Sequence, residues 1–327
     1  MIWMNGLLCL GASLVLVGVM GYAIQRGATC MVAAVAEILT VRKFRRLTAM
    51  IEASFWVLGG LLIGNALSLA GPMPPGYQVS LWTIAGAALL GLGAALNKAC
   101  VFGAIARFGA GDWSYIATPV GFYLGCRLVQ SPLLSVMTVQ VAEPSVVLAA
   151  PAWAAIPIVL WMLYRTGDPL SRHWRAPEKL VAGLWSPHTA TLVIGITYLL
   201  LLWLLGPWAY TDFLAELARG GMPETGRRAV LLLALLGGAF WGGWTASSFR
   251  PIGITARGIA RSLTGGAMMG VGSLAIPGGN DGLILTGMPL LWPHAWIALA
   301  TMCLSIAAYL SAERFLVRRM KPHPDAA

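Results

Sequence analysis

The sequence predicts an all-α, polytopic membrane protein with about nine transmembrane segments, inverted repeats and broken or re-entrant half-helices. Three observations predict this fold class: an apolar composition, spaced apolar runs, and a glycine-rich pattern that occurs twice. Hydrophobic residues make up 58 % of the 327 residues and charged residues only 10 %, and the mean hydropathy is +0.76. A soluble domain of this composition would leave too much apolar surface in water. The excess must face lipid.

The apolar runs set the expected membrane crossings. They lie at about 2–24, 48–70, 79–97, 114–139, 145–164, 188–206, 229–248, 262–277 and 288–311. The first run has neither a basic flank before it nor a clear small-residue cleavage site after it, so we expect it to be retained as a first helix. The sequence thus predicts one integral domain rather than two soluble ones.

The distribution of basic residues predicts the orientation. The net charge is +10, but the basic residues stand at the ends of apolar runs and form no aromatic-interleaved patch, which argues against nucleic-acid binding. With the N-terminus outside and the C-terminus inside, only Arg219, Arg227 and Arg228 fall outside and only Arg127 falls within a span. The remaining 18 of the 22 basic residues are then cytoplasmic, as the positive-inside rule requires of an inner-membrane protein.

An internal repeat organises the chain. A shift of 179 positions lays four glycines of the first half onto four of the second: Gly86, Gly91, Gly93 and Gly103 onto Gly265, Gly270, Gly272 and Gly282. In the orientation above the two copies run in opposite directions, as in inverted-repeat transporters. We therefore expect a single transport domain over 1–327, with pseudo-repeats at about 1–164 and 180–311 and a basic cytoplasmic tail at 312–327.

The glycine-rich breaks predict half-helices. Each copy has about fifteen apolar residues before its break, roughly 22 Å of helix, which is shorter than a hydrocarbon core of about 30 Å. Backbone freed from a helix is tolerated at membrane depth only where protein or a water-lined cavity satisfies it. Amides at half-helix N-termini can bind an anion. The alternative is that the glycines form a close-packing motif between lipid-embedded helices.

Two of the five cysteines mark irregular backbone. Cys30 follows a charged break and Cys100 lies between Gly93 and Gly103. Cys9, Cys126 and Cys303 lie inside continuous apolar runs, where a thiol usually behaves as a small hydrophobe, and packing at a tight turn is also the alternative for Cys30 and Cys100. The sequence contains neither a CxxC pair nor a His/Cys cluster at metal-ligand spacing, so we expect no metal, no cofactor and no catalytic residues.

These stretches resemble the YeeE/YedE sulfur-transport family. The resemblance is carried by Arg26 and Cys30 after the first helix, by the Gly91 to Gly103 motif around Cys100, and by the second glycine-rich copy. It implies a cytoplasmic-membrane protein of nine spans that imports thiosulfate past a line of three cysteines. The first two map to Cys30 and Cys100, but the third falls on Gly279, and Asp281 adds a carboxylate that would oppose a dianion unless it points away.

The predicted pathway for a small sulfur-containing anion combines thiols with half-helix amides. A neutral S–H donates a weak hydrogen bond to a soft sulfur while amides hold the oxygens, and weak stations permit release. The expected pathway residues are Cys30, Cys100, Gly91, Gly93, Gly103, Gly270, Gly272, Gly279 and Asn280, with Arg26, Arg127 and Asp281 as further candidates. The lipid bilayer and a soluble cytoplasmic sulfur-carrier protein are the other expected partners.

Several alternatives remain open at this stage. Arg127 could snorkel or form a structural ion pair instead of contacting solute, and Asp281 could cap the half-helix that starts at Gly282. If Gly279 replaces a relay cysteine, Gly279→Cys should keep or raise transport. An intramembrane thiol redox protein using Cys30 and Cys100, or a non-transporting scaffold of the same fold, are the competing functions.

Overall fold

Helices form along the apolar runs because a chain at membrane depth must satisfy its own backbone hydrogen bonds. The structure, a computed structural model, describes residues 2–68, 71–130, 141, 144–221 except 176–182, and 223–320. The side chains of 2–6, 167–175, 318 and 320 are not part of this description. Over these residues the chain is helical without a β-strand, which confirms the predicted polytopic all-α class.

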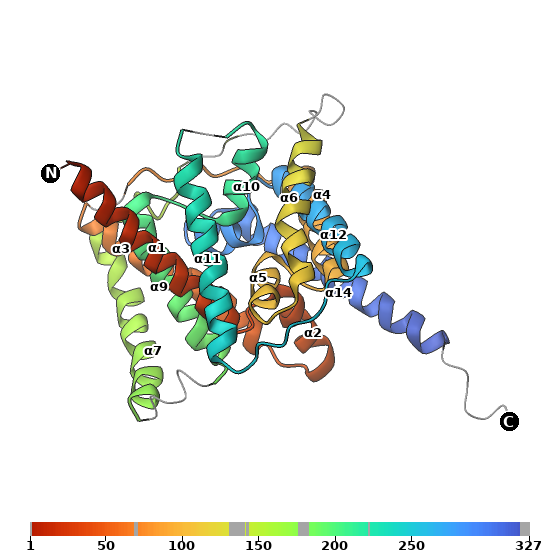
Figure 1. Cartoon of the computed structure of the whole chain (residues 1–327). Coiled ribbons are helices and arrows are strands. Elements are labelled where there is room, and N and C mark those ends of the chain that lie inside the picture. The colour runs from red at the N-terminus through yellow and green to blue at the C-terminus, as the bar shows by residue number, and fades with distance from the viewer. Residues whose placement is uncertain are drawn as a thin grey trace.

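The first half begins with a broken helix and contains a second one (Figure 1). Its elements are α1 (Ile2–Arg26), α2 (Met31–Val41), α3 (Arg45–Ala66), α4 (Leu81–Asn97), α5 (Val101–Gly109), the 3-10 turn η1 (Trp113–Ile116) and α6 (Ala117–Val129). A 3-10 turn, η2 (Ala152–Ala154), then leads into α7 (Ala155–Arg175).

The second half repeats this order. Its elements are α9 (Pro187–Leu205), α10 (Tyr210–Ala218), α11 (Thr225–Thr245), α12 (Ala256–Ala275), α13 (Asn280–Gly282), the π-helical turn η3 (Leu283–Gly287) and α14 (Pro293–Met320). Figure 1 shows α2 towards the lower face of the molecule and α10 towards the upper face. The predicted tail 312–327 is therefore helical as far as Met320, and the rest of it, with Lys321, lies outside the described residues.

Fewer than nine segments meet a strict length criterion for a membrane span. Six are long and apolar enough, and α12 with the Asn280–Gly287 helix makes a seventh if this pair, bent by 52°, counts as one span. The remaining two predicted runs correspond to α6, which has 13 residues, and to the short apolar helix Ala152–Thr166. Part of the run predicted at 114–139 falls on residues outside the described ranges.

The shift found in the sequence also relates the helix bounds. It carries the end of α1 at Arg26 onto the end of α9 at Leu205, and the starts of α2 and α5 onto those of α10 and α13. Packing partners correspond as well: α1 packs on α11 as α3 packs on α9, and α4 packs on α14 as α12 packs on α6. Among the helices of the described ranges, only α7 has no counterpart. The division into pseudo-repeats stays a prediction that these correspondences support.

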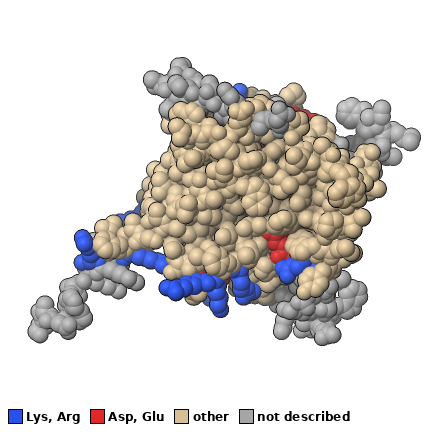
Figure 2. Space-filling view, turned by 180° about the vertical axis from the view of Figure 1, so that it is seen from behind, with Lys and Arg blue, Asp and Glu red and all other residues tan. Residues whose placement is uncertain are grey.

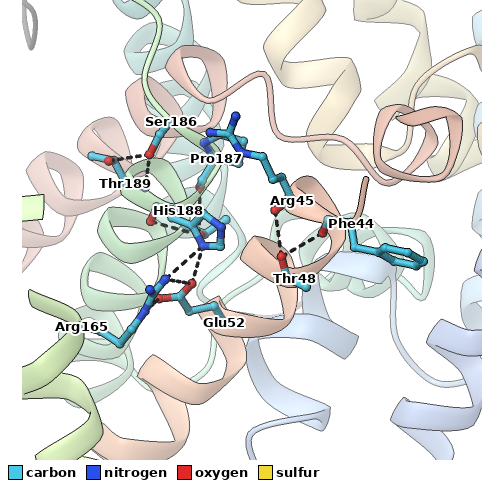
Figure 3. Close-up of polar contacts among 10 residues, drawn as sticks. Phe44, Arg45, Thr48, Glu52, Arg165, Ser186, Pro187, His188 and Thr189 are labelled. Carbon is cyan, nitrogen blue, oxygen red and sulfur yellow. Dashed lines mark hydrogen bonds and ion pairs between the residues drawn. The ribbon is translucent and has the colours of Figure 1, made fainter. Parts of the chain in front are cut away.

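An ion-paired cluster attaches α7 to the bundle (Figure 3). Arg165 of α7 donates two hydrogen bonds to the carboxylate of Glu52 in α3, from Nε to Oε1 at 2.8 Å and from Nη2 to Oε2 at 2.7 Å. His188, near the start of α9, lies 2.5 Å from Oε2 of the same carboxylate. Glu52 is buried, and the fork geometry fixes α7 against α3 and α9.

Basic side chains gather on one face of the molecule. In Figure 2 most of the Lys and Arg side chains in view lie along the lower edge. This is the face of Figure 1 on which α2 and the described end of α14 lie. The clustering agrees with the cytoplasmic side expected from the sequence, although orientation itself stays a prediction.

Glycines allow α4 and α12 to cross in direct backbone contact. A Cβ added at Gly93 would lie 2.7 Å from the carbonyl oxygen of Gly265, and one added at Gly272 would lie 2.5 Å from that of Gly86. The two contacts are equivalent under the 179-residue shift. The crossing therefore lies at the centre of the repeat and has no room for a methyl group.

This crossing gives a stability prediction. Gly93→Ala and Gly272→Ala should each lower the thermal stability of the detergent-solubilised protein, because overpacking typically costs about 1–3 kcal/mol. Gly237→Ala in α11 is the matched control, since nothing lies within 4 Å of a Cβ at that helical position. A fluorescence-detected melting curve measures the effect, and equal midpoints for all three variants would contradict the tight crossing.

Candidate functional site

Four short helices begin in the middle of the molecule, and each follows a break in a longer helix. Their N-caps are Cys30 before α2, Cys100 before α5, Ala209 before α10 and Gly279 before the helix Asn280–Gly287. Each cap is extended, and its carbonyl accepts the first helical hydrogen bond from the residue four positions on. The first amides of these helices have no partner within their own helix, so they need other groups or a ligand.

The two cap thiols of the first half lie together. The N–H of Met31, the first residue of α2, donates to Cys100 Sγ at 3.1 Å. Cys30 packs against the first turn of α5, where a Cβ at Gly103 would lie 2.4 Å from its Sγ. Gly103 is thus the residue whose missing side chain makes room for the thiol. Cys30 is 9 % exposed and Cys100 is fully buried.

The second half places oxygen where the first half places sulfur. Asp281 accepts from the backbone N–H of Thr211 at 3.3 Å and from the Thr211 hydroxyl. A carboxylate therefore caps α10, while in the first half a thiol caps α2. Asp281 caps a neighbouring helix rather than its own, which differs from the alternative of a local cap at Gly282.

A hydrogen bond joins the two halves at the centre. The Tyr210 hydroxyl, on the first residue of α10, donates to the carbonyl oxygen of Val101, the first residue of α5, at 2.9 Å. Tyr210 and Val101 are both buried. The contacts Cys30 to α5, Val101 to Tyr210, and Thr211 to Asp281 thus link all four helix starts.

A cavity of about 270 Å³ leads from the surface to Gly279. We call it the Gly279 cavity; its lining includes Pro74 and Tyr77 before α4, Thr211, Asp212, Glu216 and Arg219 of or beside α10, Arg228 of α11, Gly279, Gly282 and His294. Its walls come from the segments that the sequence predicts to lie outside. Charged side chains of both signs surround its mouth.

A second, much smaller cavity lies beside Cys30. This Cys30 cavity, of about 10 Å³, is lined by Gly27, Ala28, Thr29, Cys30, Arg46, Met50, Pro187 and Thr191. Arg46 donates from Nη1 to the carbonyl of Ala28 at 3.0 Å, across the break between α1 and α2. The cavity has room for about one water molecule and lies at the basic side of the helix starts.

Asn280 is buried without hydrogen-bond partners at the start of its helix. It is 0 % exposed, and both its amide nitrogen and its amide oxygen lack a partner among the described residues. Thr29, directly before Cys30, also has a buried hydroxyl without one. Such groups cost free energy unless something binds them. Both stand next to helix caps, which supports a polar ligand there.

The two arginine candidates hold loops and helix ends. Arg26 is fully buried, and its guanidinium donates to the Gly183 carbonyl at 2.5 Å and to the Tyr22 and Thr245 hydroxyls at 2.7 Å. Arg127 donates to the carbonyl of Ala218, the last residue of α10, at 2.8 Å. Cations are favourable at helix C-termini, and neither arginine lines the two cavities. Their roles in the pathway stay predictions.

The other candidate glycines lie at helix crossings. Gly93 and Gly272 form the α4–α12 contact, Gly91 faces Ser305 of α14, and Gly270 faces the Phe122 carbonyl of α6. These positions favour the close-packing alternative, whereas Gly103 and Gly279 touch the polar centre. The other cysteines pack: Cys126 donates to the Gly270 carbonyl and Cys303 lies 3.5 Å from the Met31 sulfur.

Sequence reasoning missed Thr211 and Asp212. Applying the 179-residue shift to Cys30 would have marked Ala209 as a helix cap, with these two residues in the turn that follows. For a metal site, the described part of the chain has no group of three or more His, Cys, Asp or Glu side chains placed to bind an ion. The centre is instead a set of amides, thiols, a hydroxyl and carboxylates.

Comparison with known proteins assigns a class to this arrangement. A family model described as sulphur transport matches residues 26–308. The chain is also 25 % identical to the thiosulfate transporter TsuA of Escherichia coli (strain K12) over 344 residues, which covers 93 % of this chain and 92 % of that protein. The matched region includes all four helix caps.

The site changes the expectation for Gly279→Cys. The backbone at Gly279 has φ −74°, which any residue can adopt, but a Cβ there would lie 2.3 Å from Thr211 Oγ1 and 2.8 Å from Asp281 Oδ1. We therefore expect Gly279→Cys to lower transport rather than to raise it. Labelled-anion uptake by cells with equal membrane levels of each variant tests this, and Gly71→Cys, with open space around it, is the control. Undiminished uptake by Gly279→Cys would contradict this expectation and would show that the Thr211 side chain moves aside to make room for the new Cβ.

Proposed function

Because the chain belongs to the sulphur transport family, as the match over residues 26–308 establishes, we propose that it imports a small sulfur-containing anion such as thiosulfate across the cytoplasmic membrane. The observation that carries the proposal is the meeting of four half-helix starts between the Gly279 cavity and the Cys30 cavity. Broken helices that meet at membrane depth are typical of solute sites in transporters. The activity breaks no covalent bond, so the protein is not an enzyme.

The anion would enter by the Gly279 cavity. Arg219 and Arg228 line the mouth of this cavity, and cationic side chains attract an anion during its approach. At the cavity floor, Gly279 begins the helix Asn280–Gly287. The backbone at this helix start and the unpaired side-chain amide of Asn280, the next residue, would supply donors for the anion's oxygens. These donors are neutral, so they bind an anion without holding it permanently.

The thiols would form the inner stations. Cys100 accepts a hydrogen bond from Met31 N–H, and its own S–H, which faces Cys30, would turn to donate to a passing sulfur. Cys30, one helix start further on, lines the Cys30 cavity. With only two thiols, the third station of the relay is taken by the Thr211 hydroxyl beside Gly279.

Release would occur on the basic face. The connection between α2 and α3 carries Arg42, Lys43, Arg45 and Arg46, and Arg46 lines the Cys30 cavity. A cytoplasmic orientation of this cluster follows from the positive-inside rule. The same cluster offers a docking surface to an acidic soluble sulfur carrier, which stays a prediction.

Uptake of labelled thiosulfate by cells that lack their own importers tests the proposal. Cells carrying the chain should accumulate thiosulfate, and Cys100→Ala should reduce the rate roughly tenfold, because it removes a donor and strands the buried Met31 N–H at a cost of about 1–3 kcal/mol. Cys100→Ser should retain more activity, since a hydroxyl accepts and donates in the same place.

Cys126→Ala is the matched control, because Cys126 is equally buried but donates to the Gly270 carbonyl of α12 and caps no helix start. Equal rates for Cys100→Ala and Cys126→Ala would overturn the thiol pathway. Failure of the unaltered protein to accumulate thiosulfate, together with a Cys30–Cys100 disulfide trapped by mild oxidation, would favour the thiol redox function, which the closeness of the two caps also permits.

Orientation can be tested with membrane-impermeant thiol reagents. Gly71→Cys should be labelled in intact cells, whereas Lys43→Cys should be labelled only after permeabilisation, because the two exposed positions lie on opposite predicted sides. A tag beside Lys321 should behave like Lys43→Cys. Labelling of all three from the outside would contradict the nine-span arrangement with a cytoplasmic C-terminus.

A further inference from the structure

Two carboxylates stand where the proposed pathway narrows. Asp281 is 2 % exposed and lies behind Gly279, held by the N–H and hydroxyl of Thr211. Asp212, which follows Thr211 in the chain, lines the Gly279 cavity, and its carboxylate lies against Gly282. An anion moving from this cavity towards Cys100 must pass both side chains. If both were ionised they would repel a dianion at close range.

Two arginines balance these charges incompletely. Arg228 is paired with Glu216, and Arg219 stands at the cavity wall at the end of α10. The carboxylates of Asp212, Asp281 and Glu216 and these two arginines form one charged group. With all three carboxylates ionised, this group has one more negative than positive charge. With one proton bound by the pair of Asp212 and Asp281, the positive and negative charges of the group are equal. The protonation state of the aspartate pair therefore decides whether the entry repels an anion.

The remaining titratable or charged groups around the pair do not replace this switch. They are Tyr77 before α4, Cys126 and Arg127 of α6, Tyr198 of α9, Tyr210 of α10, Arg227 of α11 and His294 of α14. Arg127 is engaged with the end of α10 and Arg227 with Glu224. Among these neighbours in the described structure, none is ion-paired with Asp212 or Asp281.

We propose that Asp212 and Asp281 form a proton-binding site and that the protein is a proton–anion symporter. The inference rests on the proposed function and adds its driving force. A proton from the outer solution reaches Asp212 through the Gly279 cavity, removes one of the two negative charges of the pair as the anion binds, and is released inside with the anion. Because binding is reciprocal, a bound anion strengthens proton binding as much as a bound proton strengthens anion binding.

Protonation also changes the hydrogen bonding at the third station. While Asp281 is ionised, the Thr211 hydroxyl donates to it and offers the anion only lone pairs. A protonated Asp281 can donate its own O–H to Thr211 Oγ1, which frees the Thr211 hydroxyl hydrogen. A proton that passes from Asp212 to Asp281 thus removes a repulsive charge and turns Thr211 into a donor that faces Gly279.

Purified protein in liposomes, with the membrane potential clamped by potassium and valinomycin, tests the coupling. Thiosulfate uptake should be severalfold faster at outer pH 6 than at pH 8, because a proton that binds together with the anion is more abundant outside at the lower pH. A pH-sensitive dye inside the liposomes should report acidification when thiosulfate is added. This measurement uses the unaltered protein, so it does not depend on whether a variant folds.

Asp212→Asn, which mimics the protonated residue, should transport with a rate that varies less than twofold between pH 6 and pH 8. Glu224→Gln, an exposed carboxylate exchange beside the same face, should behave like the unaltered protein. Uptake at equal rates at both pH values without acidification would overturn the symport and leave the importer standing. Absence of uptake at every pH would overturn both.

Discussion

The fold depends on one constraint: backbone amides and carbonyls cannot be left unpaired at membrane depth. Four longer helices are interrupted, and each break exposes the amides at the start of the short helix that follows. The breaks are tolerated because they meet one another. The Met31 N–H donates to Cys100 Sγ, and the Thr211 N–H donates to the Asp281 carboxylate. The Val101 carbonyl accepts from the Tyr210 hydroxyl. The need to satisfy backbone thus assembles the site.

The two halves meet this need with different chemistry. In the first half the cap of the neighbouring helix is a thiol, which is neutral and soft, and in the second it is a carboxylate held by a hydroxyl. The pseudo-symmetric backbone therefore carries an asymmetric pathway. On the proposed pathway, a solute would meet charge and oxygen first and sulfur later, which suits an anion that has both oxygen and sulfur ends.

Sequence patterns predicted the helices and the breaks at Cys30 and Cys100, because apolar runs and glycine-rich interruptions depend on local sequence. They could not assign Gly91, Gly93, Gly270 and Gly272, since a glycine at a helix crossing and a glycine at a pathway look alike in one dimension. They also missed Thr211 and Asp212, whose role comes from contact with residues about seventy positions away.

The single unmatched helix, α7, has a consequence for how such a molecule could arise. In the predicted nine-span arrangement, each repeat has four membrane-crossing elements, so a chain that finished one repeat would return to the side on which it began. Joined directly, two such copies would insert the same way up. An odd element between them reverses the second copy. In this arrangement, the Glu52–Arg165 ion pair that holds α7 in place keeps an odd number of crossings between the two halves. It thereby maintains their opposed orientation.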